Sequence, residues 1–224
     1  EMLKGFKEDV IAVGPSGHKV IGKQGTINTE SMAKKRKGSF IDLFPLSGFC
    51  LLIRKTDIKF PEDVPFYGGE HAWEIKAKRK GWRTVWAKGA FVHHVGEASS
   101  DNALELREKG VKAYTKWLAK TTPVLFTTYN RLAYTKKSLQ ALIQSNCGDI
   151  TVIDNNSTDK TKEWLKSQKN SKLHIIYNQS NKAVAGAMNQ FFDLTKDEEW
   201  VAKVDNDTIV PKDWLEKLLY SAIT

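Results

Sequence analysis

The sequence contains little cysteine and no long apolar run. Its 224 residues include only Cys50 and Cys147, which are too few for a disulfide framework or for a metal cluster of their own. The longest apolar run, residues 49–53, has five residues, whereas a membrane-spanning helix needs roughly 20. Residues 1–20 lack the charged and then apolar pattern of a secretion signal. We therefore expect a cytoplasmic globular protein.

Apolar and basic residues are plentiful. Hydrophobic residues make up 41% and aromatic residues 10% of the chain, enough for a packed core. The formal net charge is +9, and basic residues gather at 34–37 (KKRK) and 76–80 (KAKRK). These runs are either solvated faces or surfaces for anionic partners. No motif that reads nucleic acid is present, so we expect no nucleic-acid partner, and a peripheral membrane contact stays open.

The second half of the sequence alternates between two patterns. Short apolar runs typical of buried strands lie at 123–128, 149–153, 173–177 and 200–204. Helical patterns follow at 131–145, 159–168, 183–194 and from Pro211 onward. This alternation predicts an α/β fold with a parallel sheet flanked by helices.

The first half is less regular. Strand-like segments lie at 10–13, 40–46, 48–54, 83–86 and 90–93, and helical patterns at 70–80 and 102–119. Residues 16–37 are rich in glycine, lysine and serine, which predicts a loop or an irregular hairpin.

Three polar clusters follow predicted strands of the second half. Ligands of such sheets bind beyond the carboxyl ends of the strands, so we expect the clusters to converge on one site. The clusters are Thr128-Tyr129-Asn130, Asp154-Asn155-Asn156 and Asp205-Asn206-Asp207.

Several carboxylates and histidines are candidates for chemistry. Asp205 and Asp207 can bind Mg²⁺ or Mn²⁺ and leave positions open for a diphosphate, or they form a solvated turn. Asp154 can accept hydrogen bonds from a base or a ribose, or cap a helix. His94, beside His93, can complete a metal site with the two carboxylates. Glu70, at the start of a predicted helix, can act as a general base or as a favourable first-turn charge.

Taken together, these motifs resemble those of the family 2 glycosyltransferases of the GT-A fold. In the second half the matching motifs are VLFTTYNR, VIDNNSTDKT, VDND as the DxD metal motif, and NQSNKAVAGAMNQ with Ala183 where a glycine is usual. In the first half they are LSGFCLLIRK, FYGGEHAWEIKAKRKGWRT and AFVHHVGEAS.

The order of the two halves is the reverse of the family's order. Joining Thr224 to Glu1 would restore that order and would continue one amphipathic helix. We expect one GT-A (Rossmann-like) domain with a mixed, mostly parallel sheet and circularly permuted connectivity. Residues 1–100 would form the acceptor-side half, 101–120 a helical linker and 121–224 the nucleotide-sugar half. A fragment of two tandem domains and an unusual starting point are the alternatives.

The resemblance implies transfer of a sugar from a nucleotide diphosphate donor, with UDP preferred, to a hydroxyl of a glycan or lipid-linked acceptor, as in polysaccharide biosynthesis. Mn²⁺ or Mg²⁺ would be held by Asp205, Asp207 and His94. The family usually has Glu-Asp where this chain has Glu70 and His71, so either residue would be the catalytic base. The implied donor-binding residues are Thr128, Tyr129, Asn130, Arg131, Asp154, Asn156, Asn181, Lys182, Asp205 and Asn206. A catalytically silent nucleotide- or glycan-binding module is the alternative, because His71 departs from the family pattern.

Overall fold

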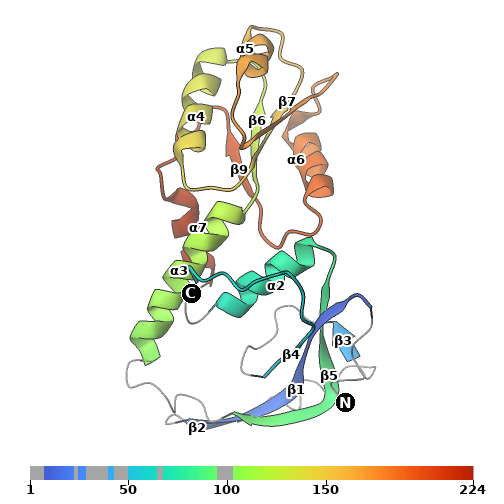
Figure 1. The fold of residues 1–224 in the computed structure, drawn as a ribbon. Coiled ribbons are helices and arrows are strands. Elements are labelled where there is room, and N and C mark those ends of the chain that lie inside the picture. The colour runs from blue at the N-terminus through green and yellow to red at the C-terminus, as the bar shows by residue number, and fades with distance from the viewer. Residues whose placement is uncertain are drawn as a thin grey trace. The chain divides into compact units, whose positions relative to one another are not determined.

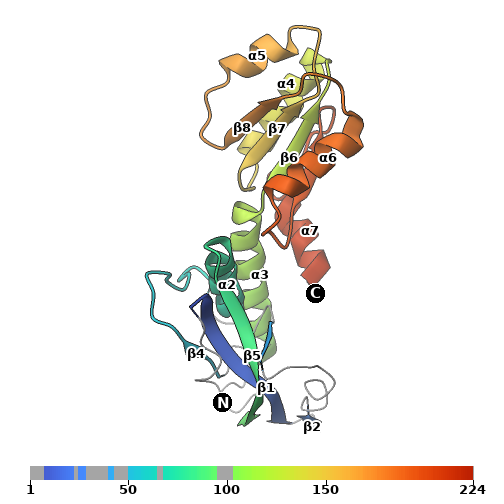
Figure 2. The same ribbon diagram turned by 90° about the vertical axis from the view of Figure 1, so that its right-hand side faces the viewer.

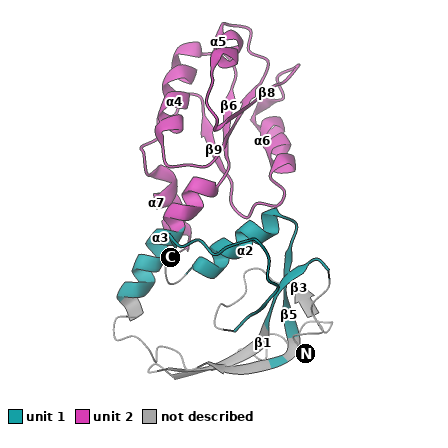
Figure 3. Cartoon of the chain, viewed as in Figure 1, with its two compact units in different colours: residues 1–114 teal, residues 115–224 magenta. Residues whose placement is uncertain are grey.

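A computed structural model describes residues 8–22, 25–28, 40–42, 50–64, 68–94 and 103–223. The chain divides into two compact units, residues 1–114 (unit 1) and 115–224 (unit 2), coloured separately in Figure 3. Each unit has its own sheet.

The sheet of unit 1 has strand order β2-β1-β5-β3, with β4 also paired to β1. Strands β1 and β5 are parallel, and the other pairs are antiparallel. The sequence predicted two strands over 83–93, but β5 is continuous. Strand β1 extends to residue 22 and forms a hairpin with β2, within the segment predicted as a loop or irregular hairpin. The strands are β1 (Val10–Gly22), β2 (Gly25–Asn28), β3 (Phe40–Asp42), β4 (Leu52–Ile53) and β5 (Arg83–His94).

Helix α2 (Gly69–Arg79) packs on this sheet through its apolar face. Trp73 and Ala77 are buried against Ile11 and Ala12 of β1. The Trp73 indole N–H donates to the carbonyl of Ile58 at 2.9 Å, which satisfies the ring's only polar atom. The sequence placed this helix at 70–80, one residue from its observed bounds.

The sheet of unit 2 is parallel throughout, with strand order β8-β7-β6-β9. The strands are β6 (Val124–Thr128), β7 (Ile150–Asp154), β8 (Leu173–Tyr177) and β9 (Ala202–Asp205). The helices are α4 (Leu132–Gln144), α5 (Thr161–Ser167), α6 (Ala183–Leu194) and α7 (Trp214–Ile223), and α3 (Ala103–Thr121) crosses the boundary between the units. A mixed α/β fold with a parallel sheet and flanking helices, as predicted, is therefore confirmed.

Helices cover both faces of the second sheet. Ala187 and Phe191 of α6 are buried against Leu125 of β6 and Ile153 of β7. Side chains alternate along a strand, so Phe126 faces the other side, and Figures 1 and 2 show α4 and α6 on opposite sides of the sheet. This sandwich fixes the strand ends at which the polar clusters lie.

Two expectations concerned the whole chain: one sheet shared by both halves, and a circularly permuted order of the halves. The described strands form two sheets rather than one sheet shared by both halves. The circularly permuted order stays a prediction.

In the described part of the chain, no helix is both long and apolar enough to cross a bilayer.

Candidate functional site

The three polar clusters meet at the carboxyl edge of the parallel sheet in unit 2. Strand register pairs Thr128 with Asp154 and Thr127 with Asp205, so the three strand ends lie level. A cavity of about 440 Å³ opens there. Its lining residues are Thr127, Thr128, Tyr129, Arg131, Asn155, Asn181, Ala183, Val184, Asp205, Asn206 and Asp207.

Asn130 ties the loop after β6 to the loop after β7. Its side-chain oxygen accepts from the backbone N–H groups of Thr158 at 2.7 Å and Asp159 at 3.2 Å. Its own N–H donates to the Ser157 hydroxyl at 2.8 Å. Asn130 was predicted to bind the donor, and the structure shows its side chain turned to the protein.

Asn206 anchors the loop after β9. Its amide nitrogen lies within hydrogen-bond distance of three oxygens: Thr128 Oγ1 at 3.2 Å, the Asn130 carbonyl at 3.2 Å and Thr135 Oγ1 at 3.0 Å. Asn206 lines the cavity and also ties the loop after β9 to β6 and α4, which fixes the positions of Asp205 and Asp207 on either side of it.

Backbone strain gathers at the same edge. Among the described residues, those other than glycine with positive φ are Asn130 (59°), Arg131 (59°), Asn156 (66°) and Ala183 (55°). The first three lie in the loops that follow β6 and β7, and Ala183 is the first residue of α6, which follows β8. Left-handed backbone is costly for residues with a Cβ and collects at functional sites, which makes this edge the candidate site.

Asp205 and Asp207 each have a basic partner. Asp205 lies 2.7 Å from Lys203 Nζ and accepts from the Thr127 hydroxyl at 3.0 Å. Asp207 lies 3.2 Å from Arg131 Nη1. Neither Thr127 nor Lys203 was predicted as a site residue, although both lie close to predicted site residues along their strands.

The two carboxylates fit a hard divalent cation in part. They come from one strand end and line one cavity, as the oxygen ligands of Mg²⁺ or Mn²⁺ do. In the described parts of the chain, no three His, Cys, Asp or Glu side chains are grouped so that they could hold a metal ion. His94 ends β5, and its side chain lies outside the described residues. Oxygen atoms of a bound ligand and of water would have to complete the coordination shell of the ion.

Asp154 is placed differently from the expectation. Its side chain is fully buried, and it accepts from the Ser157 hydroxyl and from the Ser157 N–H at 3.2 Å. Its neighbour Asn155 lines the cavity instead. The Asn155 amide accepts from Asn178 Nδ2 at 2.8 Å and donates to the Ala183 carbonyl at 3.1 Å. One lone pair and one amide hydrogen remain for a ligand.

The loop before α6 supplies the last wall of the cavity. Asn181 lines the cavity and accepts from the Ala183 N–H at 2.8 Å. Lys182 is exposed at the start of α6 but does not line the cavity, and neither does Asn156.

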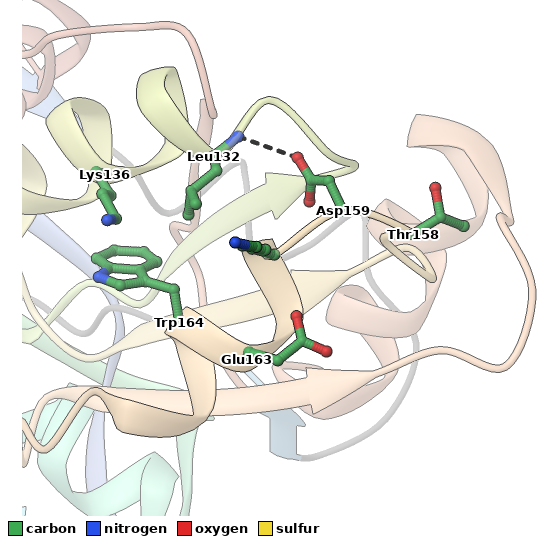
Figure 4. Close-up of a pocket in the computed structure, with 7 residues that line it drawn as sticks. Leu132, Lys136, Thr158, Asp159, Glu163 and Trp164 are labelled. Carbon is green, nitrogen blue, oxygen red and sulfur yellow. Dashed lines mark hydrogen bonds between the residues drawn. The ribbon is translucent and has the colours of Figure 1, made fainter.

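A second pocket lies beside this site, between α4 and α5 (Figure 4). In it, Lys136 Nζ lies 5.7 Å from the centroid of the Trp164 ring. Asp159 accepts from the Leu132 N–H at 3.3 Å and from the Thr161 N–H at 2.8 Å. Burial acts to raise the pKa of Asp159, but these hydrogen bonds outweigh it and lower the pKa. Asp159, rather than Asp154, thus accepts a hydrogen bond from the first backbone N–H of α5.

The two predicted catalytic residues lie in unit 1, in the first turn of α2. This helix starts after Gly68 (φ 111°), where an added Cβ would lie 2.8 Å from Tyr114 Cβ. The His71 ring meets the Tyr114 ring edge-on, with centroids 6.0 Å apart. Burial lowers the pKa of His71, and the nearby Glu70 carboxylate opposes this shift. The neutral imidazole is therefore favoured and can accept a proton.

Residues 124–223 match the model of a family described as glycosyl transferase family 2. The match begins with β6 and ends in α7, so it includes all of the described residues that line the cavity. No curated protein matches the chain.

Solved structures of TarS from S. aureus are similar to part of the chain. For TarS 1–349 the identity is 23%, over 44% of this chain and 31% of that chain, with a TM-score of 0.38. For TarS 1–349 in complex with UDP the values are 24%, 44%, 30% and 0.39. For a third structure, titled TarS, they are 24%, 44%, 18% and 0.38. The chain thus spans less than a third of the length of each of these structures.

Proposed function

We propose that the chain is a family 2 glycosyltransferase that moves a sugar from a nucleotide diphosphate donor to a hydroxyl of a glycan or related acceptor. The observation that carries this proposal is the family match over residues 124–223, because that segment holds the whole cavity and both metal-motif carboxylates. The sugar, the acceptor and the dependence on metal are parts of the proposal.

The nucleotide would occupy the cavity in unit 2. Asn155 is the proposed base contact, since its amide offers one donor and one acceptor, as the imide edge of uracil requires. Asp154 stabilises the turn that carries Asn155, because its carboxylate accepts a hydrogen bond from the Ser157 N–H. UDP is therefore the first ligand to test.

The diphosphate would lie against the end of β9. Asp207 and Asp205 would hold Mn²⁺ or Mg²⁺, which supplies Lewis-acid stabilisation of the leaving diphosphate. In the transfer, the acceptor oxygen forms a bond with the anomeric carbon, and the bond from that carbon to the diphosphate oxygen breaks. The acceptor proton passes to Glu70 or His71, acting as the general base.

Calorimetry with UDP, GDP and dTDP, each with and without Mn²⁺, tests the donor site. We expect metal-dependent binding of one nucleotide, and we expect Asp207→Asn to abolish that dependence. Asp193→Asn, which removes the same charge from an exposed position on α6, should bind as the wild type does. Absence of binding to all three nucleotides would contradict the proposal.

Product assays with Glu70→Gln and His71→Gln test the base. We expect the variant that removes the base to lose transfer and to keep nucleotide binding, because neither residue lines the cavity. A wild-type protein that binds a nucleotide but transfers no sugar to any acceptor tested would favour the silent binding module.

A further inference from the structure

Asp205 and Asp207 each pair with a basic side chain, and the two pairs differ in distance and in exposure. Lys203 and Asp205 are 2.7 Å apart and partly shielded, with 29% and 46% of their side chains exposed, and Thr127 adds a hydrogen bond to the same carboxylate. Arg131 and Asp207 are 3.2 Å apart and 63% and 48% exposed. Exposed ion pairs contribute little to stability, so the Arg131–Asp207 pair is the one that a ligand can open.

The backbone of Arg131 is fixed while its side chain reaches into solvent. Arg131 is the residue before α4, and its carbonyl accepts from the N–H groups of Tyr134 and Thr135, both at 3.0 Å. A side chain on such a base can exchange partners without moving the helix. The guanidinium, like Asp207, lines the cavity, and its planar fork matches phosphate oxygens as well as carboxylate oxygens.

We propose that Arg131 and a divalent metal ion compete for Asp207, and that the displaced Arg131 binds the diphosphate of the donor. The second part of this inference, the binding of Arg131 to the diphosphate, rests on the proposed function. The first part, the competition for Asp207, rests on the ion pair alone. Asp205 stays with Lys203, so Asp207 is the carboxylate that changes partner. Metal and nucleotide binding are then coupled, because metal frees the cation that the diphosphate needs.

The test compares Arg131→Asn with Lys137→Gln at 0.15 M salt. Asparagine tolerates the left-handed backbone at position 131, so this variant removes the cation without adding strain. Lys137 is an exposed α4 residue that does not line the cavity, and its replacement is the matched loss of one positive charge. Circular dichroism confirms that each variant is folded, and Arg131→Lys, which keeps the charge, serves as the second variant.

Calorimetry with MnCl₂ alone measures the competition. We expect Arg131→Asn to bind Mn²⁺ about 2- to 5-fold more tightly than the wild type. Calorimetry with UDP and Mn²⁺ should show the opposite sign, a loss of about 10-fold or more, because a charge-assisted hydrogen bond to phosphate is missing. Arg131→Lys should lie between, and Lys137→Gln should match the wild type in both titrations.

Effects of Arg131→Asn no larger than those of Lys137→Gln in either titration would overturn the proposal. If the wild type binds none of UDP, GDP and dTDP, the proposed function fails together with the diphosphate half of the inference. The titration with Mn²⁺ alone still decides whether Arg131 and the metal compete, so the two failures are distinguishable.

Discussion

At the scale of single residues, Asn206 combines two tasks. It stands between Asp205 and Asp207 and lines the cavity, yet its amide nitrogen faces three protein oxygens on β6, the loop after it and α4. We expect Asn206→Ala to lower the free energy of unfolding by about 1–3 kcal/mol, because buried acceptors lose their donor. Urea unfolding measures this loss.

The control for Asn206 is Asn189→Ala. Asn189 is exposed on α6, so its replacement should change stability by no more than about 0.5 kcal/mol. Equal stability of the two variants would show that Asn206 is a ligand contact only.

The burial of His71 should make the stability of the fold depend on pH. Burial holds the pKa of His71 below its usual value of 6.5. The unfolded chain therefore binds a proton more readily than the folded chain, and the stabilisation from the neutral ring is complete above pH 6.5. It is lost as the pH falls from 6.5 toward the lower pKa of the folded state.

We expect the Tm of the wild type to fall more steeply between pH 7 and pH 5 than that of His71→Gln, which has no titrating ring. Thermal unfolding across this range measures the two slopes, and pH 8 serves as the reference at which the variants differ only in packing. Parallel slopes would contradict the buried, neutral assignment of His71.

At the scale of elements, the start of α6 shows how the backbone at the edge of the cavity is strained. Ala183 is the first residue of α6 and has φ 55°, a conformation that costs residues with a Cβ roughly 1–2 kcal/mol. We expect Ala183→Gly to raise the free energy of unfolding by about 0.5–1 kcal/mol, after the larger entropy of glycine in the unfolded chain is subtracted. Urea unfolding measures the gain.

Ala185→Gly is the matched change two residues further along. Ala185 is exposed within the same helix, where glycine costs about 1 kcal/mol relative to alanine. The two substitutions should therefore shift stability in opposite directions. A loss of stability in both would mean that the left-handed geometry at Ala183 is not a strain on the fold.

The elements also show how far the sequence alone could be read. The bounds of β8 (Leu173–Tyr177) and α6 (Ala183–Leu194) were predicted without error, because a short apolar run and a helical pattern are separated there by a polar loop. Strand β5 was predicted as two strands, since glycine at position 89 is typical of a break. In the structure β5 runs on through that position, although its register with β1 shifts between Ala87 and Phe91, and long-range pairing of this kind cannot be predicted from local pattern.

The site was predicted at the level of strand ends but not at the level of atoms. Strand alternation brought the three polar clusters to one edge. It did not show that Asp154 turns back to Ser157, three residues later, or that Asn155 takes its place in the cavity. The spacing Asp-x-x-Ser is a turn signal that could have shown this. The pairing of Lys203 with Asp205 depends on side-chain conformation, which the sequence pattern does not determine.

At the scale of the whole molecule, the proposed function draws on residues of both units. The described residues that line the cavity lie between Thr127 and Asp207, all in unit 2. Glu70 and His71 belong to unit 1, within a separate sheet-and-helix core. Under the proposed function, donor binding and proton transfer would depend on residues of different cores, and we expect a nucleotide without an acceptor to bind unit 2 alone.

Hydrogen exchange with UDP and Mn²⁺ tests this division. We expect slower exchange at the amides that follow β6, β7 and β9 and at the start of α6, because these segments line the cavity. The amides of α2 and β5 should exchange at the rate of the ligand-free protein, and UDP without metal is the control for nucleotide contacts that need no cation. Protection of α2 by the nucleotide would contradict this division, because it would mean that unit 1 contributes to nucleotide binding even when no acceptor is present.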